Sequence, residues 1–144
     1  MSGELRRIQR LRHLRSHRES AAERELARAR CELVLAERKL SECRTLFSEA
    51  ADGAPRTGVT SVPDFELERL NVAVLSRRID RAADQVGAAR EMFQQRNQEL
   101  VQAHREVDQM DSWADLTREA LRAEAVRVDR VESDETAARI RSKA

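Results

Sequence analysis

Aromatic residues are scarce in this chain, and long apolar runs are absent from it. Tyrosine is missing, tryptophan occurs once, and aromatic residues make up 3% of the 144 positions. Much of the remaining apolar content is alanine, which is the best helix former but fills little volume in a core. This composition excludes a thick globular core and favours helices that share one narrow seam.

The lack of apolar runs also bears on location. No stretch approaches the roughly 18 consecutive apolar residues that cross a bilayer, and arginine interrupts every short apolar run near the start. We therefore expect neither a secretory leader nor membrane insertion. On one helix, Cys31 and Cys43 would lie about 18 Å apart, which excludes a disulfide between them. A cytoplasmic protein is the resulting prediction.

Charge of one sign is not in excess either. The 27 basic and 26 acidic side chains give a formal net charge of +1, although charged residues form 37% of the sequence. A disordered tail of this length usually carries a large net charge. The even mixture is typical of solvated helix faces with paired Arg and carboxylate side chains.

Glycine and proline are concentrated in one short stretch. Both prolines and two of the four glycines lie between positions 53 and 63. Residues 4–51 contain neither type, so the sequence predicts a first helix there, a loop over residues 52–63, and a second helix over about 64–140. Ser2 is a candidate N-cap for the first helix.

Large apolar residues recur every seven positions in both helical segments, at what we call the a positions. The interleaved d positions are mostly alanine, so large side chains of one helix would meet small ones of the other. The predicted fold is all-α: one domain over residues 1–144, a long antiparallel two-helix coiled-coil hairpin with a C-terminal helical overhang. The seam residues at a positions include Leu26, Leu33, Leu40, Phe47, Ile79, Val86, Phe93 and Leu100.

Two registers, one heptad apart, fit this pattern. In the first, Glu19 faces Arg96, so that one polar break in the seam meets another. In the second, Leu26 meets Arg96 instead. We prefer the first register, which sets Leu5 opposite Met110.

The preferred register leaves the second helix unpaired after about residue 111. Beyond that point Leu121 and Val128 keep the heptad phase, as does Val131. An unpartnered stripe of this kind is either an interaction surface or a frayed tail, and the kept phase favours the surface.

The residue types of enzymes and metal sites are present but not arranged for either role. His13 and His17 could share a helix face as metal ligands, yet no acidic or cysteine partner has suitable spacing nearby. The sequence has no Gly-rich phosphate loop and no nucleophile elbow, and a helix pair forms no concave pocket. We expect no enzyme, no cofactor and no metal.

The first 18 residues carry a strong excess of positive charge. Such a segment is either a solvated helix end, a contact for nucleic acid or membrane, or a contact for an acidic protein surface. The basic side chains are Arg6, Arg7, Arg10, Arg12, Arg15 and Arg18.

A basic segment followed by heptad leucines is also the outline of a basic leucine zipper. The segment has no asparagine to read adenine, and a zipper would leave the second helix without a purpose. A nucleic-acid-binding dimer therefore stays an alternative, as does a generic coiled-coil chaperone or adaptor.

Outward-facing apolar residues indicate a docking surface near the loop. Leu67, Leu70 and Val74 follow i, i+3, i+7 spacing away from the seam, and Leu35 points outward from the first helix. Apolar patches on a highly charged surface are typical of interaction sites.

The Arg/Glu/Ala-rich hairpin pattern of the whole chain resembles the YscO/FliJ family. These are the central stalk proteins of type III secretion and flagellar export. The resemblance rests on the opening ELRRIQRLRHLRSHRE, the run AAERELARARCELVLAERKL and the late segment REALRAEAVRVDRVESDETAARI. It implies a monomeric stalk at the cytoplasmic face of the secretion apparatus in a Gram-negative bacterium.

The same resemblance implies the partners. The end with both termini, including the six arginines, Leu121 and Val128, would enter a hexameric ATPase ring. Leu35, Leu67, Leu70 and Val74 would face the cytoplasmic domain of the export gate, and secretion chaperones are further possible partners. Neither nucleic acid nor membrane insertion is expected.

Overall fold

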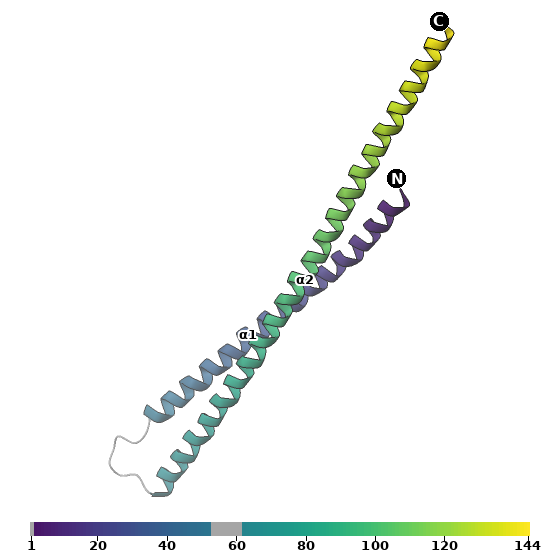
Figure 1. Cartoon of the computed structure of the whole chain (residues 1–144). Helices are drawn as coiled ribbons and strands as arrows, with labels where there is room; N and C mark the ends of the chain where they lie inside the picture. The colour runs from purple at the N-terminus through teal and green to yellow at the C-terminus, as the bar shows by residue number, and fades with distance from the viewer. Residues whose placement is uncertain (1, 53–61) are drawn as a thin grey trace. The chain divides into compact units, whose positions relative to one another are not determined.

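The computed structural model describes residues 2–52 and 62–144, and two long helices account for nearly all of them. Helix α1 spans Gly3–Asp52 and helix α2 spans Val62–Lys143, each drawn as one continuous ribbon in Figure 1. No strand occurs in these two ranges. The predicted all-α class with two long helices is confirmed. Most of the predicted loop, residues 53–61, lies outside the described residues.

Local capping explains where α1 begins. The Leu5 backbone N–H donates to Ser2 Oγ at 3.2 Å, and the Arg6 N–H donates to the Ser2 carbonyl at 3.3 Å. A serine in this position satisfies N–H groups that the first turn leaves without a helical acceptor. The predicted N-cap at Ser2 is therefore confirmed. At the other end of the chain, Arg141 and Lys143 in the last turn of α2 complement its helix dipole.

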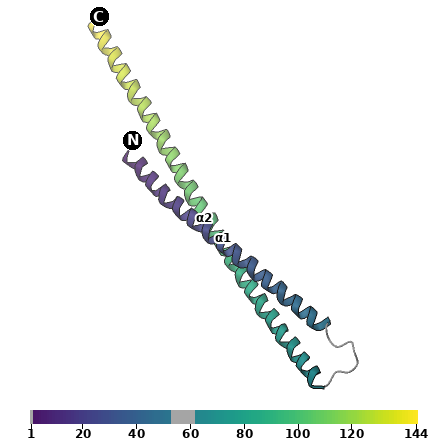
Figure 2. The ribbon, with the colours of Figure 1, turned by 180° about the vertical axis from the view of Figure 1, so that it is seen from behind.

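Contacts divide the chain into two units, which we describe separately. Unit 1 consists of Met1–Ala21 and Val101–Ala144, and unit 2 consists of Ala22–Leu100. Each unit therefore contains a segment of α1 and a segment of α2, and Figure 2 shows the same two ribbons from behind.

In unit 1, a small apolar cluster joins the two helix segments. Leu5 and Ile8 of α1 cluster with Ala114 of α2, and Ile8 is only 1% exposed. Full burial of such a side chain contributes roughly 1.5–3 kcal/mol to stability. Ala103, Val107 and Met110 are buried too.

In unit 2, small residues make up half of the buried set. Ala29 of α1 is buried, as are Leu75, Ala82 and Val86 of α2. Arg90 Nη2 lies 3.6 Å from Glu37 Oε1, so a charged pair accompanies the apolar contacts. Unit 2 therefore buries its apolar side chains along a thin line rather than in a thick core.

Burial in both units follows the heptad phase. The buried a positions are Leu5, Val86, Val107 and Ala114. The buried d positions are Ile8, Ala29, Leu75, Ala82, Ala103 and Met110. Since no buried apolar residue lies at another position, the described helices bury only the a and d stripe.

The preferred register is wrong in unit 1. Glu19 does not face Arg96; its Oε2 lies 2.8 Å from His104 Nδ1. Leu5 clusters with Ala114 rather than lying opposite Met110. The contacts fit the second register, in which α1 is displaced by one heptad along α2.

The same displacement holds in unit 2. Lys39 and Cys43 of α1 line a shallow groove of about 450 Å³ together with Arg78 and Ala82 of α2. The preferred register would instead have set Ala82 opposite Leu33. The side chain of Arg96, which this displacement brings near Leu26, turns to Glu99 on its own helix, with Nη1–Oε2 at 2.9 Å.

Unit 1 contains the physical reason for the displacement. The preferred register would have pressed Ile8 against Val107, whereas the observed one packs Ile8 with the small Ala114. It also gives hydrogen-bond acceptors on α2 to two arginines at seam positions, Arg12 and Arg15.

The unpaired part of α2 begins after Thr117, and not near residue 111 as the preferred register predicts. Thr117 is half-buried, whereas residues 118–136 are all exposed.

Candidate functional site

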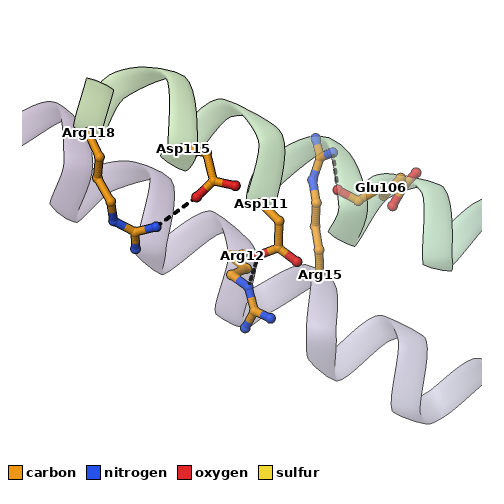
Figure 3. Close-up of polar contacts among 6 residues, drawn as sticks. All are labelled: Arg12, Arg15, Glu106, Asp111, Asp115 and Arg118. Atoms are coloured by element: carbon orange, nitrogen blue, oxygen red, sulfur yellow. Dashed lines mark hydrogen bonds and ion pairs between the residues drawn. The ribbon is translucent and has the colours of Figure 1, made fainter. Parts of the chain in front are cut away.

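The basic segment separates into two groups of arginines. Arg12 forms a hydrogen-bonded ion pair with Asp111, and Arg15 Nη1 donates to the Glu106 carbonyl at 3.4 Å. Figure 3 shows Arg15 extending from α1 to α2 and Asp111 extending from α2 to the Nε of Arg12. These two arginines join the helix segments of unit 1, because both lie at seam positions. Arg12 is nevertheless exposed, as are the other four arginines: Arg6, Arg7, Arg10 and Arg18.

The pairing has an electrostatic consequence at Arg12. The hydrogen bond to Asp111, followed by the Coulomb attraction of the same carboxylate, raises the pKa of the Arg12 guanidinium. The positive charge of Arg12 therefore faces the carboxylate of Asp111 across the two helix segments of unit 1. The neighbouring Arg118–Asp115 pair, with Nη1–Oδ1 at 3.1 Å, lies within α2 alone (Figure 3).

The other four arginines outnumber the acidic residues on the exposed surface of α1 in unit 1, where Glu4 is also exposed. Arg6 and Arg10 line a shallow groove of about 570 Å³ with His13 and Leu14. Leu14 is exposed, so the groove combines positive charge with apolar surface. Such a surface fits an acidic partner better than it fits solvent alone.

The histidines of this face contact each other. His13 Nε2 and His17 Nε2 lie 3.1 Å apart, with the ring planes at 82°. In residues 2–52 and 62–144, no group of three or more His, Cys, Asp or Glu side chains could hold a metal ion. Cys31 is exposed and Cys43 is half-buried, and both are free thiols.

The late part of α2 in unit 1 presents Leu121 and Val128 to solvent. Between them, Arg127 Nη2 lies 2.6 Å from Glu124 Oε1, and this contact lowers the pKa of the Glu124 carboxyl. The apolar side chains stay exposed because α1 does not reach this segment. Further exposed apolar residues here are Val126, Val131 and Ile140.

The early part of α2 in unit 2 is exposed from position 62 to 70. Leu67, Leu70 and Val74 line one shallow groove of about 520 Å³ with Glu68 and Asn71. The three predicted docking residues are thus brought together on α2. Leu35 of α1 is exposed but does not line this groove.

Sequence reasoning missed Val62 and Phe65 as members of the same exposed segment. Val62 is 71% exposed and Phe65 is 52% exposed. Phe65 occupies an a position, so the preferred register would have covered it with the end of α1. In the alternative register α1 ends before it reaches Phe65, so that register would have predicted the exposure of Phe65.

The predicted seam residues are buried to different degrees. Val86 is buried, whereas the remaining seven are half-buried: Leu26, Leu33, Leu40, Phe47, Ile79, Phe93 and Leu100. Two helices cannot enclose a large side chain on all sides, so half-burial is the expected state of a large residue in this seam.

Comparisons with protein-family models, with curated proteins and with solved structures found no match to this chain. Neither described helix contains a segment long and apolar enough to span a bilayer.

Proposed function

We propose that this chain is the non-enzymatic central stalk of a bacterial type III protein secretion apparatus. In this role it folds as an antiparallel coiled-coil hairpin with a C-terminal overhang, works as a monomer at the cytoplasmic face of the apparatus, and belongs to the YscO/FliJ type. It enters the hexameric ATPase ring and links that ring to the export gate, with secretion chaperones as further partners.

The observation that carries the proposal is the exposed heptad stripe of α2 after Thr117. Leu121 and Val128 continue the seam phase that α1 covers earlier in unit 1, yet both are exposed. Large apolar side chains kept in phase and left uncovered are typical of a surface that another protein covers. The exposed arginines of α1 belong to the same unit and add charge for an acidic partner.

The exposed start of α2 supports a second partner. In unit 2, the groove of Leu67, Leu70 and Val74 offers an apolar surface that is separate in sequence from the late stripe. A linking role between ATPase and export gate requires two such surfaces. We assign the early groove, with Leu35 as a further contact, to the gate.

Weak contacts suit a helix pair that serves a ring of six equal subunits. One asymmetric helix pair cannot meet six equivalent surfaces equally, so it contacts the subunits unequally and biases the order in which they fire. Exposed charge pairs are worth about 0–1 kcal/mol each, which allows the stalk to pass from one subunit to the next.

Two alternatives have less support. In a basic leucine zipper the basic segment would be free to contact phosphates, whereas Arg12 and Arg15 contact α2 of the same chain. The heptad leucines of α1 are half-buried by α2 rather than open to a second copy. A generic coiled-coil adaptor shares the exposed stripes but predicts no stimulation of an ATPase.

The test is the activity of the type III secretion ATPase from the same genome. Added chain should raise ATP turnover, and the double variant Leu121→Asp with Val128→Asp should abolish most of that rise. The matched control is Val126→Asp, because Val126 lies between the two and is exposed on another face of α2. No stimulation by the unaltered chain would overturn the proposal and favour the adaptor.

A further inference from the structure

The seam of unit 2 is almost indifferent to a shift of one heptad. In the observed register Leu33 faces Ala89 and Leu40 faces Ala82. With α1 moved by seven residues, Leu33 faces Ala82 and Leu26 faces Ala89, which are layers of the same large-on-small kind.

The shift also moves Phe47 from Leu75 to Glu68, while Leu26 leaves Arg96, so each register has one layer that sets a large apolar residue against a charged one. Packing in unit 2 alone therefore distinguishes little between the two registers.

Unit 1 distinguishes them sharply. In the observed register Ile8 packs with Ala114, and Arg12 reaches Asp111. After a shift of seven residues Ile8 would meet the larger Val107. The same shift moves Arg12 by about 10 Å along α2, beyond the reach of Asp111. Unit 1 therefore selects a register that unit 2 would accept in either form.

We propose that α1 slides along α2 between two registers one heptad apart, and that unit 1 is the latch that holds the observed one. The latch consists of the Ile8–Ala114 packing, the Arg12–Asp111 pair, the Arg15 hydrogen bond and the Glu19–His104 contact. α1 and α2 are each uninterrupted helices, so neither needs to break for the sliding motion.

Each register exposes different surface. In unit 2 the shifted register brings Ala50 against Phe65, which is exposed in the observed register. In unit 1 it leaves Ala114 and Thr117 without α1 opposite them. A partner that binds one of these surfaces therefore favours the register that exposes it, by as much as its affinities for the two registers differ. This inference concerns the helix pair itself and is independent of the secretion role.

Disulfide trapping reports the two registers directly. In a Cys31→Ser, Cys43→Ala background, Leu33→Cys is combined with Ala89→Cys for the observed register or with Ala82→Cys for the shifted one. Both pairs share one α1 position and replace one alanine each, so they are matched. A cross-link needs Cβ atoms about 4 Å apart, which excludes a signal from the wrong register. The unaltered latch should give mainly the 33–89 link.

A single substitution, Ala114→Leu, should weaken the latch and so disfavour the observed register. Ala114→Leu overpacks against Ile8 in the observed register, but it has no α1 residue opposite it in the shifted one. The ratio of the 33–82 link to the 33–89 link should rise about tenfold, since overpacking of this size shifts an equilibrium by that order. The control Ala125→Leu lies at an exposed position of α2 and should leave the ratio unchanged.

A second variant covers the case in which Ala114→Leu fails to fold, which circular dichroism would reveal. Asp111→Asn with Glu19→Gln removes the negative charges that face Arg12 and His104 without adding volume, which weakens these two contacts of the latch. It should raise the same ratio by a smaller factor. If the 33–82 link stays at background in both variants while helix content is retained, the helix pair has one register and the proposal is wrong.

Discussion

Two arginines occupy seam positions where an apolar residue is the usual choice. Arg12 lies at an a position and Arg15 at a d position, and long side chains of this kind carry their charged ends to the edge of a seam. There they meet Asp111 and the Glu106 carbonyl. A side chain that serves both as seam filler and as polar clamp fits only one register, because its acceptor lies at one place on α2.

Ile8 is the side chain on which unit 1 depends most. It is 1% exposed, so Ile8→Ala should lower the free energy of unfolding by roughly 2 kcal/mol or more through lost burial and a residual cavity. The matched control is Leu14→Ala, since Leu14 is a large aliphatic residue of the same helix but 59% exposed. Its loss should stay within about 0.5 kcal/mol. Urea unfolding monitored by circular dichroism measures both, and equal losses would contradict the assigned burial.

Glu124 should make the late part of α2 sensitive to acid. The hydrogen bond from Arg127 lowers the pKa of the Glu124 carboxyl in the folded chain. A carboxyl with a lowered folded pKa contributes stability above its ordinary pKa, and this contribution disappears as the pH falls through the folded value. The protection factors of amides around residues 124–131, which are corrected for the pH dependence of intrinsic exchange, should therefore fall in acid more than those of Glu124→Gln, which has no carboxyl to protonate. Identical acid responses would show that the pair does not stabilise this segment.

At the scale of the helices, the sequence alone predicts the all-α class and the approximate bounds of both helices. Residues 4–51 lack glycine and proline, and α1 covers Gly3–Asp52. The predicted second helix started at 64, and α2 starts at Val62. These features are local: breaker residues, a serine cap and a heptad spacing act through neighbouring positions. A single sequence displays them directly.

The register could not be chosen correctly from the same pattern. Large residues at a and alanines at d repeat every seven positions, so a shift of seven leaves most layers alike. The first register is preferred from the sequence because it pairs the charges of Glu19 and Arg96. In the structure each finds another partner, His104 and Glu99. A charge pair between Glu19 and Arg96 is therefore not required, whereas the fit of Ile8 to Ala114 exists in one register only.

The sequence predicts those parts of the candidate site that lie on one helix, but not those that depend on the register. Leu67, Leu70 and Val74 share a face of one helix, and spacing alone gives that face. The division of the arginines into the two that contact α2 and the other four depends on the register, and so does the exposure of Phe65. Neither could be obtained before the helices were aligned.

Gly87 offers a test of α2 as an element. It lies in the helix interior without positive φ, and a Cβ added there meets nothing within 4 Å. Gly87→Ala should therefore stabilise the chain by about 1 kcal/mol through helix propensity. This corresponds to a rise of about 3 °C in Tm. Gly3→Ala is the control, because Gly3 also has free space but stands at the helix start, where propensity counts least. A rise of equal size for Gly3→Ala would mean that helix propensity does not cause the effect.

At the scale of the whole molecule, the seam determines what the chain can pair with. The a positions of α1 are half-buried by α2 of the same chain, so a second copy could reach them only after α1 and α2 separate. Breaking one seam to form another exposes as much apolar area as it covers, and association also costs translational and rotational freedom. Pairing with a second copy through α1 is therefore disfavoured.

The expected result is a monomer over a wide range of concentration. Light scattering coupled to size exclusion should give the mass of one chain, 16.5 kDa, at both low and high salt. Salt is informative because a basic zipper that binds duplex DNA would lose affinity steeply as salt rises, whereas apolar seam contacts are screened little. Adding a random-sequence DNA duplex at low salt should leave the monomer peak in place, since Arg12 and Arg15 are engaged within unit 1. A mass of two chains, together with a salt-dependent shift on DNA, would favour the zipper and remove the stalk from consideration.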